Sequence, residues 1–336
     1  MKYKNKTELN KGIQILRVIL SYLIIQLHFY NYKLTKNKIL IFIRHCSDFY
    51  VPIFFVISYY FSYKAFLHKN INKMKTRLNR VLIPYILWPI IFLIINNIYY
   101  MKYKITFKDL YIQLLTGKKI HFVFWFQSSL IFSYICSSII VLIYKYDYLL
   151  ILQIIGIFGY LCECLFIYNS LLNNYIHEIK SFIHNTSKVL FYASIGMTVS
   201  FLININNLRF HRKKTLFFCL FVLYIIRDFS LIEKNFYYLK SIFNGIAATC
   251  YFIFFLLIPL EMIENYKFNL IIIQITNFTG GIYYLHTKVW DVLSQKLIIM
   301  KNKNISGCIL NYLICYFICY FGTKVFGKTK LKYLFN

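Results

Sequence analysis

Long apolar runs recur along the whole chain, and no other feature of the sequence restricts the fold as strongly. About ten of them have the length that crosses ~30 Å of hydrocarbon at ~1.5 Å of helix per residue. Backbone groups in lipid must be hydrogen-bonded within their own segment, so such runs predict helices rather than strands. We therefore expect an all-α, polytopic transmembrane helical bundle of about ten spans. The runs cover residues 13–31, 48–67, 81–100, 122–144, 147–168, 188–205, 215–233, 241–263, 268–290 and 305–323.

The composition agrees with lipid as the surrounding solvent. Charged residues make up 15% of the 336 residues and hydrophobic residues 59%, whereas a soluble domain is typically ~25% charged. Gly (11) and Pro (4) are scarce and no repeat or linker is evident, so we expect one domain over residues 1–336. The first run is a full-length span, which argues against a cleaved signal peptide. Nine Cys occur without a CxxC pair, so neither disulfides nor a metal site is expected.

The formal net charge of +28 raises nucleic acid as a partner. However, the basic residues fall between the apolar runs and do not line one amphipathic surface. This distribution is typical of loops that lie near lipid headgroups, so membrane lipid is the expected partner and nucleic acid is not.

The basic loops also predict how the chain is oriented. Four clusters of Lys and Arg fall on the same side of a ten-span bundle, and the positive-inside rule makes that side cytoplasmic. Both termini are then cytoplasmic, and the chain is a multi-pass protein of the cell (plasma or inner) membrane. The clusters are Lys2, Lys4, Lys6 and Lys11; Lys64, Lys69, Lys73, Lys75, Arg77 and Arg80; Arg209, Arg212, Lys213 and Lys214; and Lys324, Lys328, Lys330 and Lys332.

The first span carries two ionisable residues, Arg17 and His28, eleven positions apart. At ~100° per residue this separation is about three turns with only ~20° of offset, so both side chains project from one face, roughly 16 Å apart along the axis. Ser21 lies between them at helical spacing. Such a polar stripe is expected to face the bundle interior or a wet cavity. The alternative is that Arg17 reaches the inner headgroups and His28 only packs.

Other ionisable or polar aromatic residues reach the outer half of the predicted spans and could line a polar pocket open to the outside. The alternative for several of them is a helix cap or a structural ion pair. They are Asp48, His121, Trp125, Glu163, Arg227, Asp228 and His286. On the inner side, Arg77 and Arg80 lie three residues apart and share a helix face. Two such arginines either clamp phosphate groups or simply anchor the helix at the cytoplasmic surface.

Taken together, these stretches resemble the acyltransferase-3 family of multi-spanning membrane O-acyltransferases. Arg17 with ten residues before His28 is similar to the family's R-x10-H first helix. The other similar stretches, in family order, are Val51-Pro-Ile-Phe-Phe-Val-Ile-Ser58, Arg77-Leu-Asn-Arg80-Val-Leu-Ile-Pro84, Trp125-Phe126 and Gly281-Ile-Tyr-Tyr-Leu-His286. Two positions depart from the family pattern: Tyr59 stands where the family has Gly, and Thr287 follows His286 where the family has Pro.

The resemblance implies transfer of an acyl group, commonly acetyl, from cytoplasmic acyl-CoA to a hydroxyl of a sugar or surface polysaccharide, with no bound cofactor and no metal. His28 would be the base, and Arg17 would guide the negative groups of the donor. Arg77 and Arg80 would hold the phosphates of acyl-CoA. The acceptor pocket would be formed by Asp48, Ser58, Trp125, Glu163 and His286.

Three other interpretations remain open at this point. The chain could export a lipid-linked or polymeric sugar without chemistry, although only Gly280-Gly281 is a candidate helix break. It could be a receptor or scaffold. It could also belong to a different acyltransferase family that uses Asn277 with His286. The sequence leaves the acceptor, the acyl length and the oligomeric state open.

Overall fold

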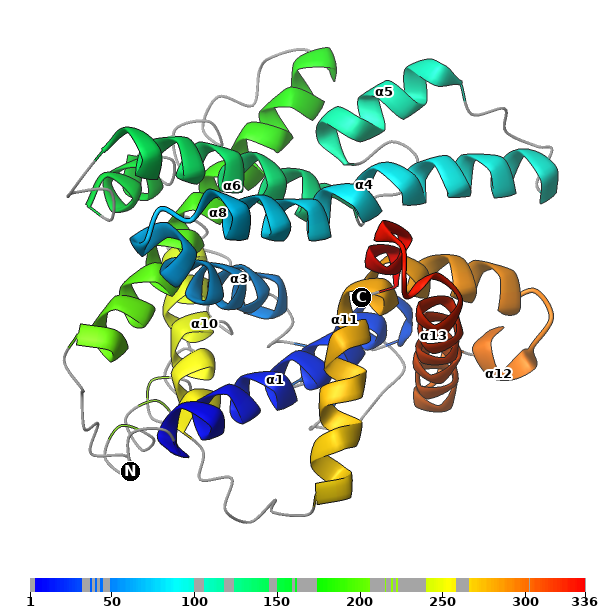
Figure 1. Cartoon of the computed structure of the whole chain (residues 1–336). Coiled ribbons are helices and arrows are strands. Elements are labelled where there is room, and N and C mark those ends of the chain that lie inside the picture. The colour runs from blue at the N-terminus through cyan, green and yellow to red at the C-terminus, as the bar shows by residue number, and fades with distance from the viewer. Residues whose placement is uncertain are drawn as a thin grey trace. The chain divides into compact units, whose positions relative to one another are not determined.

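The computed structural model describes residues 4–31, 37, 40, 43–44, 49–99, 106–117, 124–144, 150–158, 161, 174–205, 215, 219, 222, 240–257, 266–301 and 303–335. Among them it has helices and no strand, which confirms the all-α prediction (Figure 1). The named helices are α1 (Lys4–Phe29), α3 (Tyr50–Leu67), α4 (Ile71–Tyr99), α5 (Phe107–Thr116), α6 (Trp125–Ile143), α8 (Asn174–Ile205), α10 (Lys240–Leu257), α11 (Tyr266–Leu293), α12 (Ile298–Lys301), α13 (Ile305–Phe326) and the 3-10 helix η7 (Lys330–Leu334).

Five of the described helices are long and apolar enough to cross a membrane, judged by length and composition. They lie in α1, α3, α4, α6 and α13, and shorter apolar segments lie in α8 and α10. The helices α4 and α8 begin at Ile71 and Asn174, before the apolar runs that we expected at 81 and 188. Most of the expected spans 147–168 and 215–233 lies outside the described residues.

The chain divides into two compact units by its packing, and the single domain expected over residues 1–336 stays a prediction. Unit 1 consists of Met1–Phe54 and Arg209–Asn336, and unit 2 of Phe55–Leu208. Within unit 1, α10, α11 and α13 from the last third of the chain pack against the first helix, α1. Each unit is described by itself.

In unit 1, α1 packs against α10, α11 and α13. Thr276 on α11 donates a hydrogen bond to the carbonyl of Gln14, and Arg17 donates to Thr279, so α1 and α11 run in the same direction. The helix α13 runs in the opposite direction to α11, because residue 286 pairs with Asn311 and residue 281 lies against Cys319. A Cβ at Gly12 would overlap the carbonyl of Phe255, which allows α1 and α10 to touch backbone to backbone.

In unit 2, α3 runs parallel to α6. Phe55 stacks on Phe126 with 4.5 Å between ring centroids. Further along both helices, the Phe66 ring lies 5.2 Å from the Tyr134 ring. The helix α3 is also parallel to α8, because Phe55 meets Tyr192 and Tyr63 meets Phe201.

The helix α4 runs antiparallel to α6. Tyr85 on α4 meets Phe124 at the start of α6, whereas Arg77 interacts with Tyr134 further along it.

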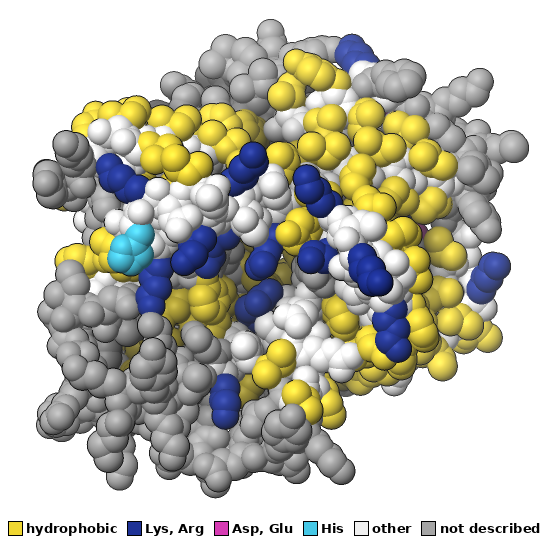
Figure 2. Space-filling view, viewed as in Figure 1, with side chains coloured by type: hydrophobic (Ala, Val, Ile, Leu, Met, Phe, Trp, Pro, Cys, Tyr) yellow, Lys and Arg dark blue, Asp and Glu magenta, His cyan; other side chains and the backbone are white. Residues whose placement is uncertain are grey.

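Much of the described surface is apolar. Figure 2 shows wide hydrophobic areas beside the Lys and Arg side chains, and no described acidic side chain is visible on that face. Large side chains with more than half their surface exposed include Ile143, Phe317 and Phe321 on α6 and α13. Exposed apolar helix faces of this kind suit a lipid environment.

Candidate functional site

Arg17 and His28 both contact α11 in unit 1. The Nη2 atom of Arg17 donates a hydrogen bond of 2.9 Å to Oγ1 of Thr279. The His28 ring stacks on the His286 ring, with 5.4 Å between centroids and 24° between planes. The prediction that both side chains share one face of the first helix is therefore confirmed, and that face is turned toward another helix. Their roles in a reaction remain a prediction.

His286 is held in a fixed orientation within α11. Its side chain is fully buried, and Nδ1 lies 2.7 Å from the carbonyl oxygen of Tyr283, one helical turn earlier. A carbonyl can only accept, so in the neutral ring Nδ1 carries the hydrogen and Nε2 carries the lone pair. The backbone carbonyl of His286 in turn accepts a hydrogen bond of 2.9 Å from Nδ2 of Asn311 on α13.

Aromatic rings surround the two histidines. Phe29 stacks on Trp290 with 4.2 Å between centroids and 6° between planes. Phe29 also lies 5.9 Å from His286, and the Tyr283 ring lies 5.7 Å from it. These rings contribute to the full burial of His286, and electrostatic interactions are stronger in such a low-dielectric environment.

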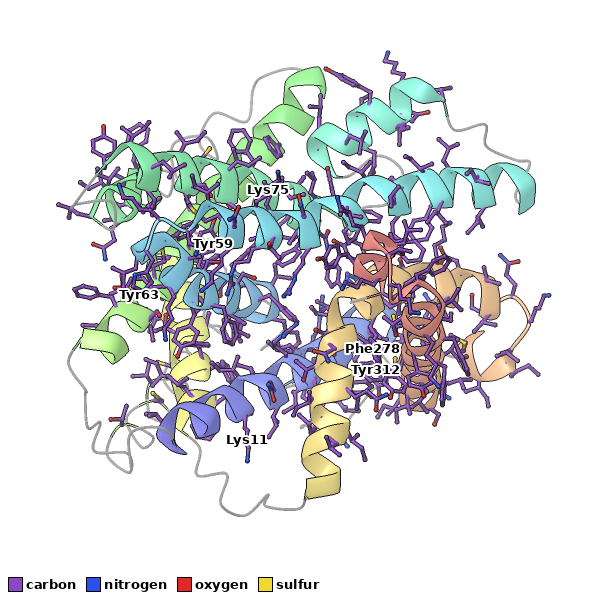
Figure 3. The ribbon with its side chains drawn as sticks, viewed as in Figure 1. Lys11, Tyr59, Tyr63, Lys75, Phe278 and Tyr312 are labelled. Atoms are coloured by element: carbon purple, nitrogen blue, oxygen red, sulfur yellow. The ribbon has the colours of Figure 1, made fainter. Side chains whose placement is uncertain are left out.

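The polar stripe of α1 continues between the two ends. The hydroxyl of Ser21 lies 3.1 Å from the hydroxyl of Tyr312 on α13 (Figure 3). Near Arg17, the Thr279 hydroxyl accepts from the guanidinium and donates to the carbonyl of Thr276. The stripe therefore faces both α11 and α13. Its three polar side chains, Arg17, Ser21 and His28, each contact a side chain of one of these helices.

The two arginines of α4 differ in their surroundings. Arg77 is half-buried, and its Nη1 atom lies 3.4 Å from Oγ of Ser62 on α3, whereas Arg80 is exposed. The sequence spacing put both on one face, but only Arg77 is turned toward the interior of unit 2.

The structure describes three of the five residues predicted for the acceptor pocket. His286 belongs to unit 1, whereas Ser58 and Trp125 are half-buried in unit 2. The carbonyl of Ser58 accepts a hydrogen bond from Ser62, and the Trp125 ring lies edge-on to Phe126. The remaining residues of the predicted set, Asp48 and Glu163, lie outside the described residues, as do His121, Arg227 and Asp228.

Asn277 and His286, which a different acyltransferase family would use together, lie on opposite sides of α11. Nine residues at ~100° each place them about half a turn apart. Asn277 is exposed and His286 fully buried, as this separation requires. The structure therefore does not bring this pair together.

Tyr59, which occupies the position of the family's Gly, is fully buried, and its hydroxyl donates a hydrogen bond of 3.0 Å to Ser133. The close helix contact is made from the other side, by Gly196 on α8. A Cβ at Gly196 would overlap the carbonyl of Val56 and lie 3.2 Å from Cβ of Tyr59. The absence of a side chain at Gly196 thus lets α8 approach α3 closely beside Tyr59.

Sequence reasoning missed Tyr283, Trp290 and Asn311, which hold or surround His286. Only Tyr283 had a signal in the sequence, since it lies three residues before His286 on the same helix face. Among the residues that the structure describes, no group of three His, Cys, Asp or Glu side chains could hold a metal ion.

In the part of the chain that the structure describes, these features define a helical protein that has helices of membrane-spanning length and a stacked histidine pair between α1 and α11. Comparison with known proteins adds no relative, because no family model, no curated protein and no solved structure matches the chain.

Proposed function

We propose that this chain is an integral membrane O-acyltransferase. It moves an acyl group, in the simplest case acetyl, from cytoplasmic acyl-CoA to a hydroxyl of a sugar or surface polysaccharide. The observation that carries the proposal is the pairing of His28 with His286, on the same face of α1 that holds Arg17 against α11. We further propose that the chain has ten spans in the cell membrane with both termini in the cytoplasm, and the helix directions described within each unit agree with spans that alternate in direction.

His28 is the base in this proposal. A sugar hydroxyl is a poor nucleophile near neutral pH, and a positioned base raises its reactivity. As the hydroxyl oxygen attacks the thioester carbonyl, His28 takes the hydroxyl proton, and the carbon–sulfur bond breaks when the tetrahedral intermediate collapses. The proton then passes from His28 to the sulfur, which leaves as free CoA. The neutral ring of His286 lies flat against His28 and keeps its plane fixed during both transfers.

Arg17 guides the donor. Its guanidinium cannot lose its charge, and its bond to Thr279 holds it about three turns of helix from His28. That distance rules out a shared reacting atom, so Arg17 acts on the negative groups of the donor. Arg77 and Arg80 hold further phosphates of the donor at the cytoplasmic surface.

The direct test is transfer of radiolabelled acetyl from acetyl-CoA in isolated membranes with and without the chain. We expect label in a glycan fraction, and release of that label by mild alkali, which cleaves O-esters and leaves amides. Membranes that move labelled sugar across the bilayer but never acquire alkali-labile acetyl would identify an exporter instead.

Replacing Arg17 with glutamine should raise the KM for acetyl-CoA about tenfold and change kcat much less, because a charge that attracts the donor is lost while the base is kept. Lys11→Gln makes the same charge change earlier on the same helix and is the matched control. Steady-state rates over a range of acetyl-CoA concentrations measure both. Equal KM values for the two variants would exclude Arg17 from donor binding.

A further inference from the structure

The histidine pair lies near one end of unit 1. His28 is the last residue but one of α1, and His286 lies about two turns before the end of α11. Because α13 runs opposite to α11, it begins at this same end. In the proposed orientation this end faces the outside of the cell, so its side chains are the first that an acceptor meets.

A positive charge lies near His28 at this end. Arg44 follows α1 in the chain, is exposed, and lies close enough to the His28 ring to interact with it electrostatically. Its segment is anchored, because the hydroxyl of buried Tyr50 donates a hydrogen bond of 2.8 Å to the carbonyl of Ile43. A positive charge near a general base opposes the protonation that the base must undergo, unless an anion neutralises that charge. The position of Arg44 therefore suits a reaction in which an anion is bound beside the base.

The turn between α12 and α13 brings a second positive charge to the same end. The backbone N–H of Asn31, three residues after His28, donates a hydrogen bond of 3.1 Å to the carbonyl of Lys303. The Lys303 side chain is exposed, and its φ of 49° is in the left-handed region that non-glycine residues rarely adopt. The next residue, Asn304, caps α13 by accepting a hydrogen bond of 2.8 Å from the N–H of Gly307. The turn is thus held to both α1 and α13.

The two connections that carry these cations are strongly basic. Residues 30–47 and 292–304 contain seven Lys and Arg and neither Asp nor Glu. Asp291, at the end of α11, interacts with Lys288 of its own helix. Outer connections of membrane proteins are normally poor in Lys and Arg. In the proposed orientation both connections are outer ones, so their charge is contrary to this rule, and an anionic ligand on that side accounts for it.

We infer that the acceptor is an anionic polysaccharide whose charged groups bind Arg44 and Lys303, which deepens the proposed function and rests on it for the outward orientation of this end. Guanidinium and ammonium groups form charge-assisted hydrogen bonds with the oxygens of carboxylates and phosphodiesters. Because Arg44 is close to His28, the charged group lies on the sugar that is acylated or on its neighbour. The bound anion neutralises Arg44 while His28 takes the hydroxyl proton.

The test measures binding to the full chain in nanodiscs of phosphatidylcholine, a lipid without net charge. Three fluorescent oligomers of similar length are the probes: an oligogalacturonate, an oligo(glycerol phosphate) and a neutral oligogalactose. Fluorescence anisotropy gives the Kd of each. The double variant Arg44→Gln with Lys303→Gln removes two exposed charges. Lys328→Gln with Lys330→Gln removes two exposed charges beyond the opposite end of α13 and is the matched control.

We expect at least one anionic probe to bind about tenfold more tightly than the neutral probe, and the Arg44 and Lys303 variant to lose about that factor. The control variant should bind as the unmodified chain does. The anionic probe that responds identifies carboxylate or phosphodiester, and an equal response of both identifies charge alone as the recognised feature. Equal affinity for charged and neutral probes would overturn the inference, as would an equal loss of affinity in the two variants.

The outcome is separable from that of the proposed function. If membranes transfer no acetyl but binding of an anionic probe depends on Arg44 and Lys303, the enzyme proposal fails and the anion-binding surface stands. If acetyl is transferred and no probe responds to these substitutions, the anion-binding surface fails and the enzyme proposal stands.

Discussion

Replacing His28 with alanine should lower the rate of acetyl transfer by about a hundredfold to ten-thousandfold, the range that a lost general base produces. The effect is expected in kcat, because His28 acts on the acceptor proton and not on the phosphates of the donor. Transfer of alkali-labile radiolabelled acetyl in isolated membranes measures it.

His68→Ala is the control for this experiment, since His68 is an exposed histidine in the turn between α3 and α4. His28→Gln keeps most of the volume and a polar group, and it separates loss of the base from loss of packing against His286. Protein levels and the thermal midpoint in detergent show whether each variant is folded. A folded His28 variant with full transfer activity would remove this residue from the mechanism.

Replacing Gly196 with alanine should destabilise unit 2 by about 1–3 kcal/mol, the usual cost of an overpacked core. The added Cβ would overlap the carbonyl of Val56 and approach the backbone nitrogen of Tyr60 at 3.1 Å. These are backbone atoms, so α3 as a whole would have to move away from α8. Gly196→Val should cost more, because two further carbon atoms must be placed.

The sign of this effect is decisive, because helix propensity alone predicts the opposite. Alanine in place of glycine within a helix is favourable by about 0.5–1 kcal/mol when packing does not interfere. Leu202→Ala lies on the same helix at a position that is 38% exposed and is the control. Thermal unfolding of the purified protein in detergent compares them. A higher midpoint for Gly196→Ala would show that α3 and α8 are not in close contact there.

Helix periodicity is why one part of the candidate site could be predicted. The offset between Arg17 and His28 depends only on the turn of a single helix, so their shared face followed from their spacing. The partners of that face could not be predicted in the same way. Thr279 and His286 lie more than 250 residues further along the chain, and only packing brings α11 against α1.

The two arginines of α4 illustrate the same limit. Spacing placed Arg77 and Arg80 together, yet their exposure differs because α3 and α6 cover only one of them. The substitution of Tyr for Gly at position 59 is a second case. The resemblance has a Gly at this position, whereas here the close contact is supplied by Gly196, on a helix more than a hundred residues away.

The sequence by itself determined that this chain is helical and apolar enough to lie in a membrane, because hydrogen bonding within each segment and the length of each apolar run are local properties. It also determined which side chains share a face of one helix. Only the tertiary structure decided that His28 meets His286, that Arg77 turns toward Ser62 and Tyr134, and that the chain forms two units. Contacts between distant helices depend on the shape and volume of both surfaces, and no single segment carries that information.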